Sequence, residues 1–433
     1  MSFFRRLIFL HYLLFAALIF LNSCGSSDAD FPNNPGGEDQ SPPVAPGDFT
    51  AVAISRTEVR LTWSDRSNNE TGFHIFESVD NDTSFELIEQ VGVDVETTVL
   101  YGKSREQDYY YKICAVNEYG SSNFSNISEV SGGALLLTID TGDSPVLAVA
   151  YDPLGDYVVA GCGDFRVRRY SAESGSLIQS SQLHERAVLS VACSPDGRYV
   201  ASGSQDSTAR VRVWDTMEEI VKWTYSDDRM GNVKQVEYNE DGDYLAGLCG
   251  NVWIWDAANG DLIDVVGNDN VLSFAFISDS RDLILATNYG LELWQIDGAD
   301  SALVRYRTST GNDISVSPDR QYIASTHDKA VLLWKVSGAG EGMSFTFVEP
   351  ENLSDSDWHT DVVSAVDFSS DGDYLASGDL DGKIKIWRVE NFSLETTLDA
   401  HDRYAYCLDY SKEGNYLVSG GGEGQVKIWA MFF

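Results

Sequence analysis

The chain has 433 residues, of which 43% are hydrophobic and 22% charged, and this apolar content is too high for a disordered protein. Its 67 Asp and Glu residues outnumber its 30 Lys and Arg residues, so the formal net charge is −37. This balance argues against nucleic acid as a partner, because a phosphate-binding surface would oppose the overall field. Aromatic residues reach 12%, glycine counts 37, and no long 3.6-residue period follows residue 42, so we expect an all-β protein.

Residues 1–23 have the pattern of a signal peptide. Arg5 and Arg6 precede an apolar run over 7–21, which is shorter than the roughly 20 residues that a spanning helix needs. The run ends in Leu21-Asn22-Ser23-Cys24, which resembles the lipobox of bacterial lipoproteins. That resemblance implies cleavage before Cys24 and attachment of lipid, including acyl chains such as palmitate, to this cysteine. Asn22 departs from the usual small residue, and ordinary secretion or an uncleaved anchor stay open.

A lipid anchor at Cys24 would define where the protein is found. Several acyl chains on one residue suffice for stable membrane attachment. Gly25 follows the cysteine in place of the Asp that retains enteric lipoproteins at the inner membrane, so we expect an outer-membrane protein. The folded part would then be periplasmic or surface-exposed. Residues 24–41 are rich in Ser, Asp, Gly and Pro, which predicts a flexible tether.

Residues 42–133 contain short alternating runs that predict half-buried strands, as in VRLTWSD at 59–65. The segment resembles a fibronectin type III domain on its opening prolines, Leu61-Thr62-Trp63, Asn69-Glu70-Thr71-Gly72-Phe73 and Tyr109-x-Tyr111-Lys112-Ile113. The resemblance implies that Trp63 is the core tryptophan and that the Tyr109 hydroxyl ties a corner. Both roles are structural. With no Arg-Gly-Asp tripeptide to support adhesion, we interpret the domain as a spacer or docking module.

Residues 134–433 contain an internal repeat. Its units are spaced 39 to 53 residues apart and close on an aromatic residue at Tyr170, Trp214, Trp255, Trp294, Trp334, Trp387 and Trp429. Before the aromatic come two strands joined by a turn that often carries glycine, as in AVDFSSDGDYLASG. The units resemble WD-repeat β-propellers, which implies seven blades. The last unit lacks an outer strand, and we expect the strand over 134–140 to complete it and close the ring.

The same resemblance implies a hydrogen-bonded chain of His, Ser, an acid and Trp inside a blade. The matching sets are His359, Ser377, Asp381 and Trp387; His401, Ser419, Glu423 and Trp429; and His184, Ser202, Asp206 and Trp214. Because these sets recur, they indicate architecture rather than a catalytic triad, which an enzyme needs once. We predict no catalytic residue, cofactor or metal ligand. Asp355, Asp357 and Asp361 are interpreted as a solvated acidic loop, with weak cation binding left open.

Residues after the His of each unit lie on the upper face of WD-repeat relatives, which makes Arg186, Asp361, Arg403 and Tyr404 the candidate partner-binding residues. The two arginines either form a local positive spot or pair with neighbouring acids. Trp358 is a further candidate, at the end of an insertion predicted over 338–358. Long loops on rigid scaffolds often bind partners, although tolerated decoration stays open.

Together these patterns predict a monomeric, non-enzymatic scaffold that recognises protein or glycan partners. Two alternatives stay open: a passive surface protein, and an enzyme or enzyme accessory, which would need a unique polar constellation in the central channel. Five cysteines remain after Cys24, and we expect buried free thiols, with one disulfide left open. They are Cys114, Cys162, Cys193, Cys249 and Cys407.

Overall fold

The computed structural model describes most of the chain beyond residue 40. The described residues are 41–55, 57–79, 81–103, 108–130, 133–206, 210–267, 270–277, 282–296, 304–306, 311, 313–337, 344–348 and 357–431. Cys24, the predicted signal peptide and nearly all of the predicted tether lie outside them. Every regular element in these ranges is a strand, which confirms the all-β prediction. The described part of the chain contains no helix with the length and hydropathy needed to cross a bilayer.

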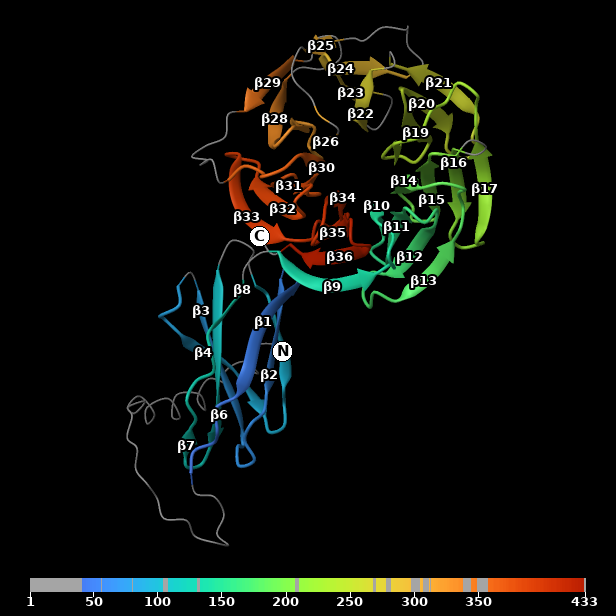
Figure 1. The fold of residues 1–433 in the computed structure, drawn as a ribbon. Helices are drawn as coiled ribbons and strands as arrows, with labels where there is room; N and C mark the ends of the chain where they lie inside the picture. The colour runs from blue at the N-terminus through green and yellow to red at the C-terminus, as the bar shows by residue number, and fades with distance from the viewer. Residues whose placement is uncertain are drawn as a thin grey trace, which may run out of the picture.

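The N-terminal strands form two sheets that face each other across one core. The first sheet has the order β1 (Gly47–Ser55), β2 (Glu58–Ser64), β5 (Thr97–Tyr101). The second has the order β4 (Glu86–Gly92), β3 (Gly72–Val79), β6 (Tyr109–Asn117), β7 (Gly120–Ser121), and β8 (Ser128–Val130) also pairs with β6. All pairings are antiparallel. Figure 1 shows these sheets below the ring formed by the strands β9 to β36.

Aromatic side chains fill the space between the two sheets. Trp63 of β2 is buried, with its ring centroid 5.6 Å from that of Phe73 on β3. Tyr109 is also buried and stacks on Tyr111, with centroids 6.3 Å apart. The Tyr111 hydroxyl donates to Glu77 Oε2 at 2.7 Å. The corner-tying role of the Tyr109 hydroxyl stays a prediction.

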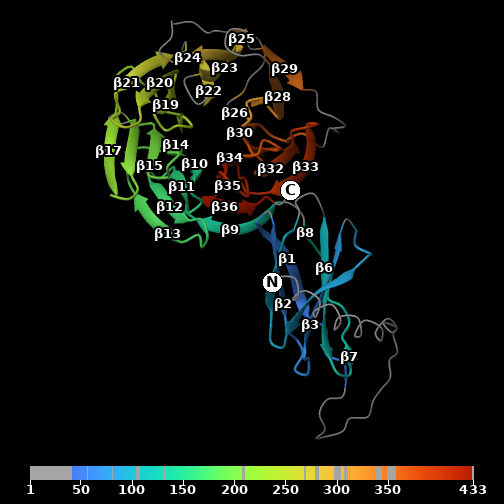
Figure 2. The same ribbon diagram turned by 180° about the vertical axis from the view of Figure 1, so that it is seen from behind.

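The remaining strands form seven four-stranded antiparallel sheets in the described residues, which we call blades and number along the chain. Figures 1 and 2 show them around a ring, each blade running outward from a strand at the centre. The first four blades are β10 (Val146–Tyr151), β11 (Tyr157–Cys162), β12 (Val167–Ser171), β13 (Leu177–Ser181); β14 (Val188–Cys193), β15 (Tyr199–Ser204), β16 (Val211–Asp215), β17 (Ile220–Tyr225); β18 (Gln235–Tyr238), β19 (Tyr244–Cys249), β20 (Asn251–Asp256), β21 (Leu262–Val266); and β22 (Val271–Phe276), β23 (Asp282–Thr287), β24 (Gly290–Gln295), β25 (Val304–Tyr306).

The last three blades complete the ring. They are β26 (Ile314–Val316), β27 (Tyr322–His327), β28 (Ala330–Ser337), β29 (Ser344–Val348); β30 (Val363–Phe368), β31 (Tyr374–Asp379), β32 (Lys383–Arg388), β33 (Ser393–Asp399); and β34 (Ala405–Tyr410), β35 (Tyr416–Gly421), β36 (Gln425–Ala430), β9 (Ala134–Asp140). The outer strand of the seventh blade is therefore β9, as the sequence predicts. Ile139 of β9 lies opposite Val426 of β36, so the two ends of the repeat region share one sheet.

The turns inside the blades follow from local chemistry. In the sixth blade, the Ser369 hydroxyl donates to Asp371 Oδ1 at 2.6 Å and the Gly372 N–H donates to Ser369 O at 2.8 Å. Gly372 has a φ of +77°, a conformation that strains residues with a Cβ atom. A serine, an aspartate and a glycine thus form the tight turn that joins β30 to β31.

The predicted insertion over 338–358 needs a correction. Its residues 344–348 form β29, the outer strand of the fifth blade, where Phe347 lies opposite Trp334. Their ring centroids are 5.4 Å apart. Each of the six spacings between closing aromatics contains the outer strand of a blade, so β29 belongs to the regular blade pattern and not to an insertion. Residues 338–343 and 349–356 lie outside the described ranges.

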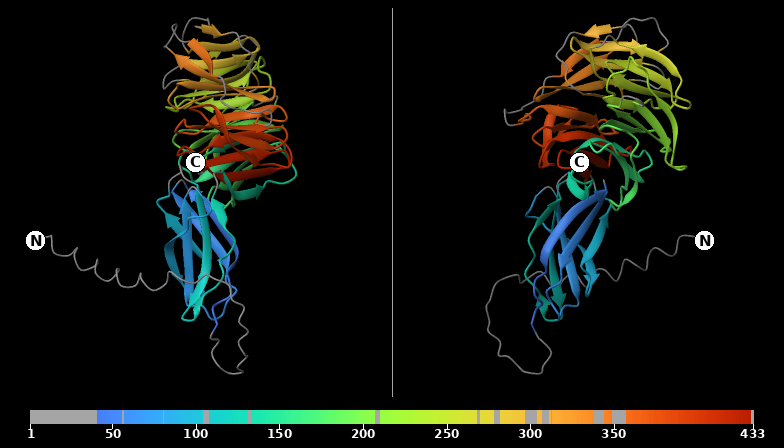
Figure 3. Two further views of the ribbon diagram at one scale, coloured as in Figure 1. Left: turned by 90° about the vertical axis from the view of Figure 1, so that its left-hand side faces the viewer. Right: turned by 45° about the vertical axis from the view of Figure 1, so that its right-hand side comes forward.

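The sandwich contacts the seventh blade directly. The Tyr416 hydroxyl of β35 donates to Ile54 O of β1 at 3.0 Å, and Ala430 of β36 belongs to the sandwich core. A cavity of about 330 Å³ lies between the two parts, lined by residues that include Arg60 and Leu136. Figure 3 shows the sandwich beside the rim of the ring.

Candidate functional site

The two faces of the ring are built from different connections. On one face, the segment that leads into the inner strand of a blade lies beside the turn between the second and third strands of that blade. In the sixth blade the Leu380 N–H donates to Val362 O at 3.0 Å, and in the seventh the Gly422 N–H donates to Arg403 O at 2.9 Å. We call this the upper face. The opposite, lower face carries the turns between first and second strands, such as that of Gly372.

The second blade contains a buried His–Ser–Asp cluster. His184 Nδ1 lies 2.8 Å from Asp206 Oδ2, and His184 Nε2 lies 2.8 Å from Ser202 Oγ. All three residues are buried. The sequence also places Trp214 in this chain, but its Nε1 is buried with no hydrogen-bond partner, so the chain ends at Ser202.

In the sixth blade the acid differs from the one that the sequence predicts. His359 Nδ1 lies 2.7 Å from Asp379 Oδ2, whereas Asp381 is exposed and accepts from the Thr360 hydroxyl at 2.6 Å. The remaining contacts are present: His359 Nε2 lies 2.6 Å from Ser377 Oγ, and Trp387 Nε1 donates to that oxygen at 2.8 Å. Asp379 therefore replaces Asp381 in the chain, two residues earlier in the same turn.

The seventh blade contains the full predicted chain. His401 Nδ1 lies 2.5 Å from Glu423 Oε1, His401 Nε2 lies 2.9 Å from Ser419 Oγ, and Trp429 Nε1 donates to Ser419 Oγ at 3.0 Å. Burial lowers the pKa of His401 below its usual value, as it does for His359 in the sixth blade. A neutral imidazole suits this arrangement, donating from Nδ1 and accepting the serine proton at Nε2.

These serines are not placed for nucleophilic attack. Ser202, Ser377 and Ser419 are each 0% exposed, so no substrate carbon can approach their oxygens. The clusters join the segment before an inner strand to the second and third strands of the same blade. In these clusters each buried polar side chain has a hydrogen-bond partner, and the hydrogen bonds stiffen the blade.

A second set of polar side chains lies on the inner strands. Glu237, Asp367 and Asp409 occupy matching register positions in three blades, and each accepts a backbone N–H from the next blade around the ring. The bonds run from Phe276 N to Glu237 Oε1 at 3.2 Å, from Tyr410 N to Asp367 Oδ2 at 2.9 Å, and from Tyr151 N to Asp409 Oδ2 at 2.6 Å. This set is not among the residues predicted from the sequence, although the runs QVEY, AVDF and CLDY carry an acid at the same position.

Burial of these carboxyl groups shifts their titration. It raises the pKa of Glu237 to about 8, with additional repulsion from Asp313 and Asp367. Asp313, which accepts from the Val366 N–H at 2.9 Å, has its pKa raised to about 7, again chiefly by burial. Burial likewise raises the pKa values of Asp367 and Asp409. Four acids thus converge on the centre of the ring and resist full ionisation at neutral pH.

The centre of the ring opens into a cavity of about 430 Å³, lined by inner strands of the first, second, third and seventh blades. Glu237 and Asp409 line it, together with residues of lower-face turns such as Pro153, Pro195 and Lys412. The cavity therefore lies toward the lower face, opposite the face that carries the predicted partner-binding residues.

The upper face displays most of those predicted residues. Arg186, Arg403 and Tyr404 are exposed, and Tyr404 has 42% of its surface accessible. Asp361 is half-buried, and its Oδ1 accepts the Val362 N–H at 2.7 Å. Trp358 is half-buried against the sixth blade, with its ring centroid 6.0 Å from that of Trp387. Trp358 therefore contributes to packing rather than projecting from the surface.

Two further aromatic residues lie on the upper face and are not among the residues predicted from the sequence. Phe165 and Tyr289 are exposed in turns between second and third strands, of the first and fourth blades. The Gly163 N–H beside Phe165 donates to Pro145 O, which ties this turn to the segment entering the inner strand. Their turn position, directly before the strand that ends in the closing aromatic, is the signal that identifies them.

Among the five remaining cysteines, Cys162, Cys193, Cys249 and Cys407 are free thiols. Cys162 and Cys249 are buried, which confirms the expectation for these two, whereas Cys193 and Cys407 are half-buried; Cys114 is also buried. Burial raises the pKa of Cys249 to about 12, which keeps its thiol protonated and unreactive.

Four segments of the chain match the WD40 family, described as "WD domain, G-beta repeat": residues 133–171, 175–215, 353–388 and 392–430. They contain the first, second, sixth and seventh closing aromatics. The chain therefore carries WD40 repeats, and its ring of blades is a WD-repeat β-propeller. The units closed by Trp255, Trp294 and Trp334 lie outside the matched segments.

Relatives of this chain include WD-repeat and complex-subunit proteins. Target of rapamycin complex subunit wat1 of Schizosaccharomyces pombe is 25% identical over 120 residues, covering 27% of this chain and 35% of the relative. WD repeat-containing protein 1 of Xenopus tropicalis is 25% identical over 206 residues, covering 45% and 32%. Target of rapamycin complex subunit LST8-1 of Arabidopsis thaliana is 28% identical over 109 residues, covering 24% and 33%. The matches span about a third of each relative's length.

Proposed function

We propose that this chain, which carries WD40 repeats, is a non-enzymatic platform for protein partners. In this proposal it is an outer-membrane lipoprotein of the bacterial envelope, monomeric, with a fibronectin type III sandwich that holds a seven-bladed propeller. The names of two relatives identify them as complex subunits, which supports a role in assembly. The core position of Trp63 and the two facing sheets support the fibronectin type III assignment.

The observation that carries the platform role is the exposed Arg403–Tyr404 pair on a rigid support. Tyr404 has a φ of +38°, and the Gly422 N–H donates to both Arg403 O and Tyr404 O, at 2.9 and 3.1 Å. The blade beneath is braced by His401 and Glu423. An exposed tyrosine and arginine in a preorganised loop are efficient interface anchors, because little conformational entropy is lost on binding.

Affinity capture tests this role. The full chain with Arg403→Glu and Tyr404→Ala is compared with wild type by cross-linking and capture from envelope extracts. A matched control carries Lys412→Glu and Leu154→Ala, which alter an exposed cation and an exposed large residue of the lower face. We expect the upper-face variant to lose the partners that wild type and control retain. Equal capture by all three proteins would contradict the assignment.

The lipid anchor has a separate test. Cys24→Ser removes the thiol that a lipoprotein acylates, so we expect it to abolish incorporation of labelled palmitate and release the protein from the outer membrane. Incorporation of label in the Cys24→Ser variant at the wild-type level would rule out this anchor. The binding role of the propeller does not depend on the result.

An enzyme or an enzyme accessory is the second candidate, and the central carboxylates favour it. Glu237 and Asp409 share one cavity, with a third acid, Asp367, beside Asp409. Each of the three nevertheless accepts a backbone N–H from the neighbouring blade, which supports an architectural role. Substituting Glu237→Gln in an activity screen with glycan and peptide substrates distinguishes the two. The capture experiment has two other outcomes. Capture of glycans would indicate a glycan-binding platform, and capture of no partner would indicate a passive surface protein.

A further inference from the structure

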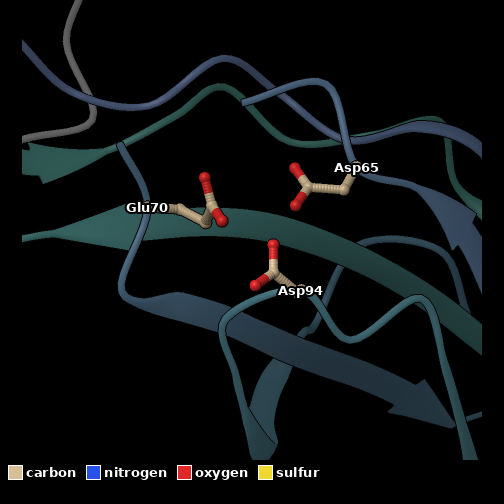
Figure 4. Close-up of side chains that lie close together, drawn as sticks. All are labelled: Asp65, Glu70 and Asp94. Atoms are coloured by element: carbon tan, nitrogen blue, oxygen red, sulfur yellow. The ribbon is translucent and has the colours of Figure 1, made fainter. Parts of the chain in front are cut away.

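Three carboxylates converge at the end of the sandwich that lies away from the propeller. Asp65 directly follows β2, Glu70 lies shortly before β3, and Asp94 lies between β4 and β5. One oxygen of each lies within 4.8 Å of the others. Figure 4 shows the three side chains directed toward one another from separate parts of the backbone.

Glu70 is the distinctive member of this cluster. Its side chain belongs to a residue only 8% exposed, and its Oε2 is buried with no hydrogen-bond partner. Burying a carboxylate without a partner is costly, and two nearby carboxylates add repulsion. Arg66, the cation nearest in sequence, pairs instead with Asp48 at 3.0 Å. A cation between the three groups would satisfy the buried oxygen.

We propose that Asp65, Glu70 and Asp94 form a calcium site. Ca²⁺ takes six to eight oxygen ligands at about 2.3–2.6 Å in flexible geometry, so opposite ligands lie about 4.6–5.2 Å apart. Oxygens within 4.8 Å of one another fit inside that sphere. Mg²⁺ demands near-octahedral ligands at about 2.0–2.1 Å and retains several waters, which suits a site drawn from three loop positions less well.

The loops around the cluster leave it accessible on one side. Asp65 Oδ1 accepts the Ser67 N–H at 2.9 Å, and Asp94 is exposed, with a φ of +60°. Solvent can therefore supply the remaining ligands beside Asp94. Three carboxylates with added waters correspond to the weaker extracellular class of calcium sites, with a Kd of about 10⁻⁴–10⁻³ M.

The position of the site gives it a structural consequence. The segment with Asp65 and Glu70 connects β2 of the first sheet to β3 of the second, and the Asp94 turn connects β4 of the second sheet to β5 of the first. One bound ion would hold together the two connections that pass between the sheets. Asn69, next to Glu70, donates from Nδ2 to Ser41 O at 3.1 Å, so the proposed ion site lies close to the start of the sandwich.

Calcium titration of the chelator-treated full chain tests the proposal. Binding is measured by equilibrium dialysis with Ca²⁺ in 0.15 M NaCl, and thermal unfolding is recorded with Ca²⁺ or Mg²⁺. We expect one saturable Ca²⁺ per chain and a rise of about 2–5 °C in the sandwich transition, with a smaller response to Mg²⁺. The Glu70→Gln variant should bind Ca²⁺ at least about tenfold more weakly.

Two further variants make the outcome decisive. Glu86→Gln removes one exposed carboxylate at the opposite end of β4 and controls for diffuse attraction of Ca²⁺ to a chain of net charge −37. Asp94→Asn replaces an exposed residue with one that also accepts a positive φ, so it tests the site even if Glu70→Gln fails to fold. Calcium binding by Glu70→Gln or Asp94→Asn that equals binding by Glu86→Gln overturns the proposal. The capture experiment does not depend on this result.

Discussion

Thr141 and Gly424 are 283 residues apart in the chain, yet the Thr141 hydroxyl donates to Gly424 O at 2.8 Å and the Thr141 N–H donates to the same oxygen at 2.9 Å. Thr141 directly follows β9, and Gly424 precedes β36. The contact therefore extends the strand pairing that joins the beginning of the propeller to its end. Because the seventh blade is completed by a distant segment, unfolding of either terminal blade must break this pairing.

Removing the buried part of the closing strand should destabilise the propeller. Ile139 is 5% exposed and packs in a cluster with Val426 and Val146, so Ile139→Ala should lower the free energy of unfolding by about 2–4 kcal/mol. Leu135→Ala is the matched control, because Leu135 lies on the same strand and is 44% exposed. Urea unfolding measures both. Equal losses would contradict a closing role for the buried face of β9.

The correction in the sixth blade can be tested with two substitutions. Asp379→Ala leaves His359 Nδ1 and the backbone N–H groups of Asp381 and Lys383 without their acceptor, so we expect a loss of about 2–4 kcal/mol. Asp381→Ala removes an exposed carboxylate with one hydroxyl partner and should cost less than about 1 kcal/mol. Thermal unfolding compares them, and the reverse order would restore Asp381 to the chain.

The central carboxylates predict a pH dependence of stability. The pKa of Glu237 is raised from 4.5 to about 8 in the folded protein, so the folded state binds more protons than the unfolded state between these values. Its favourable contribution is complete below about pH 4.5 and is lost as the pH rises through 8. Glu237→Gln should therefore raise stability at pH 8 by up to about 4 kcal/mol and leave stability at pH 4 nearly unchanged.

Urea unfolding between pH 4 and pH 9 measures this effect. Glu390→Gln, which changes an exposed acid that does not line the central cavity, is the control and should follow the wild-type curve. A Glu237→Gln curve parallel to wild type at all pH values would show that this carboxyl titrates normally.

Trp358 should behave as a packing residue. It is half-buried, and its ring lies beside Trp387, so Trp358→Ala should lower the free energy of unfolding by about 1–3 kcal/mol while capture of partners is retained. Trp358→Phe keeps an aromatic contact and should lose less. Loss of capture with unchanged stability would instead return Trp358 to the partner-binding surface.

Much of the fold follows from local patterns. Alternating runs and Ser-Asp-Gly turns predict the strands and their order, and the repeat spacing predicts the blades. The resemblance to WD repeats predicts the contacts of Ser377 and Ser419, because residues at matched positions in a repeat meet the same neighbours. The acid in the sixth blade differs because Asp379 and Asp381 share one short turn. Which one faces His359 depends on the path of that turn.

The sequence by itself determined the strand periodicity and the positions that turn inward, since hydrophobic alternation and turn chemistry act over a few residues. It also indicated the closing role of 134–140, because the repeat leaves its last unit one strand short. Only the tertiary structure decided which charges meet. Glu237, Asp367 and Asp409 lie on different blades, and Asp65 and Asp94 follow different strands, so their proximity depends on how the sheets are arranged. Electrostatic interactions act through space, so the spacing of residues within one repeat does not encode contacts between different blades or between separate loops.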